Sequence, residues 1–193
     1  MYPQKIMGHD IVLKTLSATE ENADLVYHLV QKNKDYLSMF FDKLVLAFSD
    51  KKRSLQILKF DEEQRSCQKA LNYYVFVDDK IIGEIAADWS SKERSTSIVY
   101  WLDKSQSGKG YISRSLKLME YILFAAKHQE IRLYIDVTNL RSADVAMRAG
   151  YQLSEDTNYY FKTYQMYCEN YKSLCRQMPY SKRYFEKNKE FFR

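Results

Sequence analysis

The chain has 193 residues, 46% of them hydrophobic, and a formal net charge of +5. This length and composition allow one substantial core but are short for two ordinary domains, so we expect a single domain with an elaborated C-terminal end. No stretch approaches the roughly 18 uncharged apolar residues of a membrane span, and no apolar run follows a basic segment at the N-terminus, so we expect a cytoplasmic protein that does not bind membranes. The three cysteines and three histidines are scattered, so neither a disulfide framework nor a metal site is expected.

Positive charge is concentrated near the C-terminus. Residues 157–193 carry eight Lys or Arg and three Glu, and their balance of +5 equals that of the whole chain. Tyr and Phe alternate with these basic residues, which is typical either of a segment that follows a nucleic acid or of an amphipathic helix that docks by its rings. We favour docking over nucleic-acid binding. The expected organisation is a domain over 1–170 and a basic, aromatic helical extension over 171–193.

The first third of the chain predicts a strand followed by helices. Residues 11–16 predict a short strand. The segment 17–20, with the sequence SATE, offers a hydroxyl N-cap and acidic residues for the first turn of a helix. The charged stretch 49–68 predicts a surface helix with a connecting loop.

The middle of the chain predicts three strands and then a long helix. Apolar residues recur with period two over 73–77 and 81–89, and the intervening DDK segment suits a tight hairpin turn. A third strand is predicted over 97–102. After a glycine-containing loop, the apolar positions 112–123 are spaced by four, three and four residues, which predicts an amphipathic helix.

The last part of the domain predicts a crossover. Residues 131–137 alternate between apolar and polar, so strand, helix and strand follow one another, an order that implies a right-handed crossover with two parallel strands. A short helix is expected from 139 to the glycine at 150, and a further strand from 151. The tyrosines over 160–171 fit both a strand and a helix. Residues 180–192 look helical.

The glycine pair around Lys109 raises the first functional question. Gly108 and Gly110 separate a predicted strand from a predicted helix, and glycine permits positive φ and close approach of a ligand. Backbone N–H groups at a helix start can bind an anion. The segment matches neither the Walker pattern nor the dinucleotide-binding pattern. Taken alone, the glycine pair is weak evidence for phosphate binding, because any strand-to-helix turn can use glycine.

The surrounding residues resemble a known family. The chain carries YWLD at 100–103, GKGY at 108–111, a long helix, an alternating strand, N-x-x-S at 139–142 and AGY at 149–151. This order and spacing resembles the GNAT superfamily of acyl-CoA-dependent N-acetyltransferases, and more narrowly its Rim-type branch, which acetylates ribosomal-protein N-termini. The resemblance is clearest over residues 73–153. It implies a mixed α/β fold with a central, mostly antiparallel sheet, one parallel splayed pair and helices on both faces.

The resemblance implies acetyl-CoA as the cofactor. In the family, a loop with the pattern Q/R-x-x-G-x-G/A wraps the CoA pyrophosphate with its amides, and the splayed strands hold the pantetheine arm. Here Ser107 and Ile112 stand at the first and last positions of that pattern, and Gln106 could take the first position if the loop shifts by one residue. Asn139 is implied near the thiol end and Ser142 near the thioester sulfur, although both residue types also cap helices. The implied cofactor contacts are Trp101, Leu102, Ser107, Gly108, Lys109, Gly110, Tyr111, Ile112, Asn139 and Ser142.

Transfer of an acetyl group to an amine sets the chemical demands. The amine must lose a proton, the oxyanion needs donors, and the leaving thiolate benefits from a proton. By resemblance, Ser142 is the candidate that protonates sulfur; Tyr100 is a second candidate acid, with strand packing as its alternative. Relatives carry a glutamate where this chain has Tyr159-Tyr160-Phe161. Glu84 is therefore our candidate base, because an acid in a mostly apolar strand faces either a site or solvent.

The acceptor side has the least distinctive sequence. Tyr36, Phe40 and Phe41 are candidate substrate-binding residues, with a core role as the alternative. We expect a protein N-terminal amine as acceptor, by direct attack in a ternary complex; the alternative is a small amine such as a polyamine, an antibiotic or a peptide toxin. The rival from another class is a non-catalytic CoA-fold module that binds RNA or protein through its basic tail. A monomer or a homodimer is expected.

Overall fold

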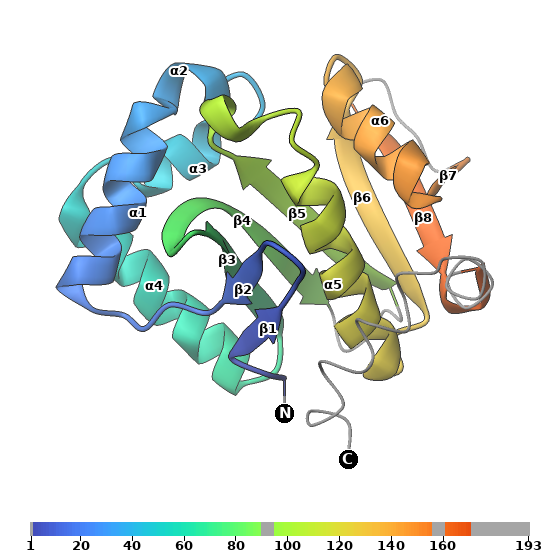
Figure 1. The fold of residues 1–193 in the computed structure, drawn as a ribbon, viewed down its shortest axis with the longest axis horizontal. Coiled ribbons are helices and arrows are strands. Elements are labelled where there is room, and N and C mark those ends of the chain that lie inside the picture. The colour runs from blue at the N-terminus through green and yellow to red at the C-terminus, as the bar shows by residue number, and fades with distance from the viewer. Residues whose placement is uncertain (1, 90–94, 156–160, 171–193) are drawn as a thin grey trace.

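The computed structural model describes residues 2–89, 95–155 and 161–170 (Figure 1). The predicted extension over 171–193, including the helix expected over 180–192, lies outside the described residues. Within the described ranges, no helix is long and apolar enough to cross a membrane.

An eight-stranded sheet forms the centre of the described structure, with spatial order β1-β2-β3-β4-β5-β6-β8-β7. Its strands are β1 (Lys5–Met7), β2 (Val12–Lys14), β3 (Ala70–Val77), β4 (Lys80–Trp89), β5 (Ser95–Leu102), β6 (Glu130–Asp136), β7 (Gln152–Leu153) and β8 (Phe161–Tyr167). Among the described strands, only β5 and β6 pair in parallel, and the other pairs are antiparallel. The predicted mixed α/β class with one parallel pair is confirmed.

Helices cover both faces of the sheet (Figure 1). One group consists of α1 (Glu20–Lys32), α2 (Lys34–Leu37), α3 (Asp42–Ala47) and α4 (Lys51–Ser66), and the other of α5 (Tyr111–Ala125) and α6 (Leu140–Ala149). Neighbouring residues of β3 show why two cores form. Tyr73 packs in the core that contains α5, whereas Tyr74 packs in the core of the first four helices, because successive side chains of a strand point to opposite faces.

Local signals determine where several elements begin. Thr19 is the N-cap of α1 and its hydroxyl accepts a 3.2 Å hydrogen bond from the Asn22 amide, as the SATE segment predicts. Asp78 and Asp79 both have positive φ, +48° and +59°, the conformation of the two-residue turns that close hairpins. Both features agree with the sequence predictions.

The ambiguous segment after residue 160 is a strand. β8 pairs antiparallel with β6 from Phe161 opposite Asp136 to Tyr167 opposite Glu130. The tyrosine spacing alone fits a helix equally well, but β8 satisfies the backbone groups along β6, which would otherwise be an open edge. Tertiary pairing, and not local pattern, decides the structure here.

Candidate active site

Strands β5 and β6 run parallel and then separate. They pair over residues 95–97 of β5 and 130–132 of β6, although the strands continue to Leu102 and Asp136. A hollow of about 60 Å³ lies between the separated parts, lined by residues of both strands. The splayed pair that the resemblance implies is therefore present, and its opening leaves backbone groups of both strands free of pairing with each other.

The glycine loop lies between β5 and α5. Gly108 has φ +80° and Gly110 has φ +75°, in the left-handed region that favours glycine. Gly110 is the N-cap of α5 and has no side chain to bond the amides of the first turn. A Cβ built at Gly108 would meet no atom within 4 Å, so the loop is open there. An open loop beside an uncapped helix start is suited to an anion.

A cleft of about 860 Å³ joins this loop to the splayed strands and to α2. Most of the cofactor contacts implied by the sequence line it: Trp101, Leu102, Ser107, Gly108, Gly110, Tyr111, Ile112, Asn139 and Ser142. The candidate acceptor residues Tyr36, Phe40 and Phe41 also line it, as does the candidate acid Tyr100. Residues from distant parts of the sequence therefore meet around one cavity.

Tyr100 and Ser142 meet where α6 begins. The Tyr100 hydroxyl donates to the backbone carbonyl of Ser142 at 3.3 Å. Asn139 caps the helix, because its Oδ1 accepts a 3.1 Å hydrogen bond from the Ser142 amide. Burial raises the pKa of the Tyr100 hydroxyl well above its usual range, and the bond to Ser142 acts in the opposite direction. The Tyr100 hydroxyl therefore remains protonated at neutral pH.

Glu84 does not line the cleft. It lies on β4 opposite Trp101 of β5 and is 7% exposed. Its Oε2 accepts a 2.8 Å hydrogen bond from Trp101 Nε1, and its Oε1 accepts a 3.2 Å bond from Asn72 Nδ2. Burial raises the pKa of the carboxyl, while these two bonds act in the opposite direction.

The expectation that Glu84 faces either solvent or the site is wrong. Its strand neighbours Tyr74 and Trp101 belong to the core beneath the first four helices. Period-two alternation shows which residues share a face, but it does not show that helices cover that face. The position of Glu84 behind Trp101 does not support a role as general base.

Lys109 bonds to Gln106 within the glycine loop. Its ammonium group donates a 2.9 Å hydrogen bond to Gln106 Oε1, and neither residue is among those that line the cleft. Ser107, which takes the first position of the loop pattern if the loop is not shifted, does line the cleft.

Several charged cleft residues were not predicted from the sequence. Arg141, Asp144 and Arg148 line it from α6, and Lys104 lines it from the short 3-10 turn at Lys104–Gln106. The α6 residues follow one another at intervals of three and four, so a helical projection from the Asn139 cap would have found them. Lys104 carries no such signal.

The class of the protein follows from comparison with known proteins. Residues 12–152 match the family model for the acetyltransferase (GNAT) domain, which makes the protein an acetyltransferase that uses acetyl-CoA. The match spans most of the chain, and the chain belongs to the GNAT acetyltransferase family. A relative, the ribosomal-protein-serine acetyltransferase of Escherichia coli (strain K12), is 30% identical over 147 residues, which cover 73% of this chain and 79% of the relative.

Solved structures share the fold at lower identity. The ribosomal alpha-N-protein acetyltransferase RimL in complex with coenzyme A matches with a TM-score of 0.74 at 19% identity, over 84% of this chain and 97% of that one. The microcin self-immunity acetyltransferase MccE in complex with acetyl-CoA and AMP matches with a TM-score of 0.71 at 18% identity, over 83% and 93%. At these identities the likeness establishes the fold alone.

Proposed function

We propose that this enzyme acetylates the α-amino group of a protein N-terminus, with a ribosomal protein as the substrate class. The observation that carries the proposal is the 30% identity over 147 residues to a ribosomal-protein-serine acetyltransferase. Such a protein acts in the cytoplasm, where ribosomal proteins are made. The geometry of the cleft supplies further support for the cofactor and for the acceptor.

The cleft fits acetyl-CoA. The amides of residues 107–112 would hold the pyrophosphate, because they combine the open glycine loop with the positive end of α5. The separated parts of β5 and β6 would hold the extended arm with their unpaired backbone groups. Arg141 and Arg148 add positive charge along the cleft, which suits a ligand that carries phosphates.

The acceptor end favours a peptide over a polyamine. Tyr36, Phe40 and Phe41 supply aromatic surface, and Lys104 supplies a positive charge beside Tyr36, with its ammonium 5.9 Å from the ring centroid. Among the described residues that line the cleft, Asp144 is the only carboxylate, and it is exposed. A polycation would meet little complementary charge, whereas the neutral backbone of a peptide would meet no repulsion.

Tyr100, Ser142 and the acceptor amine itself can meet the chemical demands of acetyl transfer without Glu84 as a base. Bound acetyl-CoA supplies an acetyl group activated as a thioester. The hydroxyls of Tyr100 and Ser142 stand on the same cleft wall and are the candidate proton donors to the leaving thiolate. An α-amino group has a pKa of about 8, so a substantial neutral fraction exists near neutral pH without a buried base.

A small amine with a flat ring is the second candidate acceptor. The aromatic residues and Lys104 at the acceptor end suit a ring that carries a negative group. The similar MccE structure holds AMP together with acetyl-CoA, which supports testing a nucleotide-linked amine.

Mass spectrometry of candidate acceptors tests the proposal. The enzyme is incubated with acetyl-CoA and a peptide that begins with a free Ser and contains an internal Lys. The same peptide with a blocked N-terminus, spermidine and an aminoacyl nucleotide analogue serve as comparison acceptors. We expect one acetyl group on the free N-terminus and none on the blocked peptide. Preferred acetylation of spermidine or the nucleotide analogue would assign the enzyme to small amines instead.

A further inference from the structure

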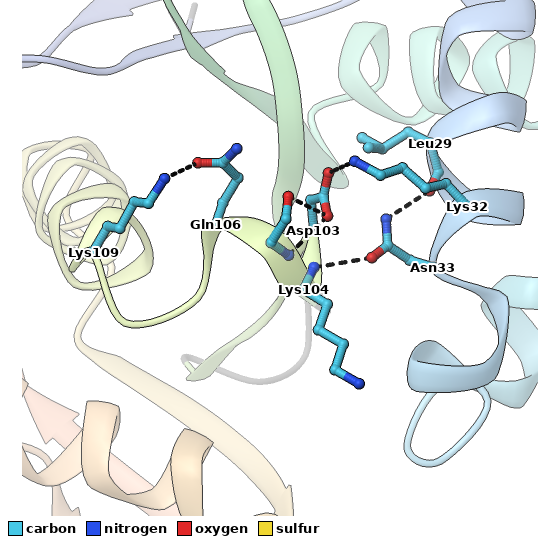
Figure 2. Close-up of polar contacts among 8 residues, drawn as sticks. Leu29, Lys32, Asn33, Asp103, Lys104, Gln106 and Lys109 are labelled. Atoms are coloured by element: carbon cyan, nitrogen blue, oxygen red, sulfur yellow. Dashed lines mark hydrogen bonds and ion pairs between the residues drawn. The ribbon is translucent and has the colours of Figure 1, made fainter.

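The end of helix α1 is tied directly to the glycine loop. Lys32 and Asn33 stand at the C-terminus of α1, and both bond to residues 103–104, where β5 ends and the loop begins (Figure 2). The bonded residues are 71 positions apart in the sequence. Both bonds therefore connect the helices of the acceptor side with the loop of the cofactor side.

The first tie is an ion pair. Lys32 Nζ lies 2.6 Å from Asp103 Oδ2; the lysine side chain is 60% exposed, whereas the aspartate side chain is 7% exposed. The other oxygen, Asp103 Oδ1, accepts 3.0 Å bonds from the amide and the hydroxyl of Ser105. Burial alone would raise the pKa of Asp103, but the bonds from Lys32 and Ser105 outweigh it and lower the pKa. The carboxylate is therefore charged and fully engaged.

The second tie is a buried amide. Asn33 is 4% exposed. Its Oδ1 accepts a 2.9 Å bond from the Lys104 backbone amide, and its Nδ2 donates a 2.9 Å bond to the Leu29 carbonyl in α1. Figure 2 shows this bridge beside the Lys32–Asp103 pair. Because both ends of the side chain are used, Asn33 fixes the start of the loop relative to the last turn of α1.

The ties join two walls of the same cleft. Asn33 is directly followed by α2, which brings Tyr36 to the acceptor end. Asp103 and Lys104 are directly followed by the segment that brings Ser107 and Gly108 to the cofactor end. The ammonium of Lys104 itself lies over Tyr36. A shift of either wall would strain both bonds.

We propose that Lys32 and Asn33 are positioning residues that hold the loop over 103–110 in its cofactor-binding shape and couple it to the acceptor side. The proposal rests on the proposed function, because the two walls matter only if cofactor and acceptor meet in this cleft. Neither residue lines the cleft, so both act through Asp103 and Lys104. Coupling of this kind is reciprocal: if a bound acceptor changes the affinity for acetyl-CoA, bound acetyl-CoA changes the affinity for the acceptor by the same factor.

Calorimetric titration with acetyl-CoA, without any acceptor, tests the ion pair. Lys32→Met removes the pair, and because Lys32 is largely exposed the variant should fold. Lys34→Met is the matched control, since it removes the same charge from an exposed residue two positions away. We expect Lys32→Met to weaken acetyl-CoA binding about fivefold or more, Lys34→Met to change it less than about twofold, and Lys32→Arg to restore it.

A double-mutant cycle separates positioning from a general effect. Asp103→Asn should weaken acetyl-CoA binding as Lys32→Met does, and the double variant should be no weaker than either single variant. In steady-state kinetics the KM for acetyl-CoA should rise while kcat is retained. A merely structural defect would lower the active fraction, and hence the apparent kcat, at constant KM.

The outcomes distinguish this proposal from the proposed function. Equal acetyl-CoA affinity in the parent and in Lys32→Met would overturn the positioning role and leave the proposed function standing. Equal weakening by Lys32→Met and Lys34→Met would also overturn it, because long-range charge would then explain the effect. Failure of every tested N-terminal peptide as acceptor, with the acetyl-CoA results as expected, would count against the proposed acceptor alone.

Discussion

The indole nitrogen of Trp101 donates a 2.8 Å hydrogen bond to the buried carboxyl of Glu84. Trp101 lines the cleft, whereas Glu84 lies behind it in the core beneath the first four helices. The carboxyl therefore acts on the site by fixing the orientation of a wall residue. A group in this position supports the shape of the site.

Glu84→Gln should leave catalysis largely intact. The amide oxygen of Gln can still accept the bond from Trp101, so we expect kcat to change less than about threefold, whereas loss of a general base costs about 100-fold or more. Glu84→Leu should destabilise the fold by about 1–3 kcal/mol, because the buried indole N–H would lose its acceptor. Steady-state kinetics and denaturant unfolding measure both effects. A hundredfold loss in Glu84→Gln would return Glu84 to the role of base.

Tyr100→Phe should separate the ring from the hydroxyl. The ring packs in the core on the α5 side, so the variant should fold and bind acetyl-CoA normally. If the hydroxyl gives a proton during transfer, kcat should fall about 100-fold with an unchanged KM for acetyl-CoA. Tyr167→Phe, at an exposed position of β8, is the control. An unaltered kcat in Tyr100→Phe would leave the hydroxyl as a packing group that bonds Ser142.

Gly83→Ala should disturb the wall of the cleft from the neighbouring strand. A Cβ at this position would lie 2.3 Å from the Trp101 carbonyl oxygen and 2.9 Å from the Leu102 Cα. Both are backbone atoms of β5 that cannot move aside as a side chain would. We expect a loss of about 1–3 kcal/mol in the free energy of unfolding together with weaker acetyl-CoA binding. An unfolding temperature of Gly83→Ala equal to that of the parent would contradict this close approach of the two strands.

Two buried carboxyls should make the protein less stable as pH rises. Burial, with repulsion from Glu84, raises the pKa of Asp61 from 3.8 to about 8, against the opposing charge of Arg65. Burial also raises the pKa of Glu120 from 4.5 to about 8. Each carboxyl binds its proton more tightly in the folded state than in the unfolded state. Its contribution to the free energy of unfolding is therefore complete below its ordinary pKa and is lost as pH rises toward about 8.

Unfolding experiments across this pH range measure the effect. Each group should lower the free energy of unfolding by about 1.4 kcal/mol per pH unit between its two pKa values. Asp61→Asn should remove the contribution of Asp61 to the pH dependence of the free energy of unfolding. Glu63→Gln, at an exposed position of the same helix, should leave this pH dependence unchanged. A flat pH dependence in the parent would show that neither carboxyl is held protonated.

Much of the fold was predictable because its signals are local. The Thr19 cap, the turn at Asp78 and Asp79, and the Asn139 and Gly150 ends of α6 all follow from residue types at fixed offsets. The parallel pair follows from the order of strand, helix and strand. Apart from the parallel pairing itself, these features do not depend on contacts between distant segments.

The features that escaped prediction depend on such contacts. The bond between Lys32 and Asp103 joins residues 71 positions apart, and the YWLD motif that contains Asp103 does not indicate Lys32 as its partner. The burial of Glu84 depends on helices that come from an earlier part of the chain. Spacing along the sequence carries no information about any of these partners.

Titration of the enzyme with acetyl-CoA by calorimetry, in parallel with Gly110→Glu, tests the central claim most directly. A Cβ at Gly110 meets only the flexible end of Arg114, at 2.9 Å, so the variant should fold, with strain from the positive φ. Its carboxylate would repel the anion that the loop is built to hold. We predict saturable binding by the parent and none by the folded variant. Equal binding by both would contradict the assignment of this loop as the cofactor site.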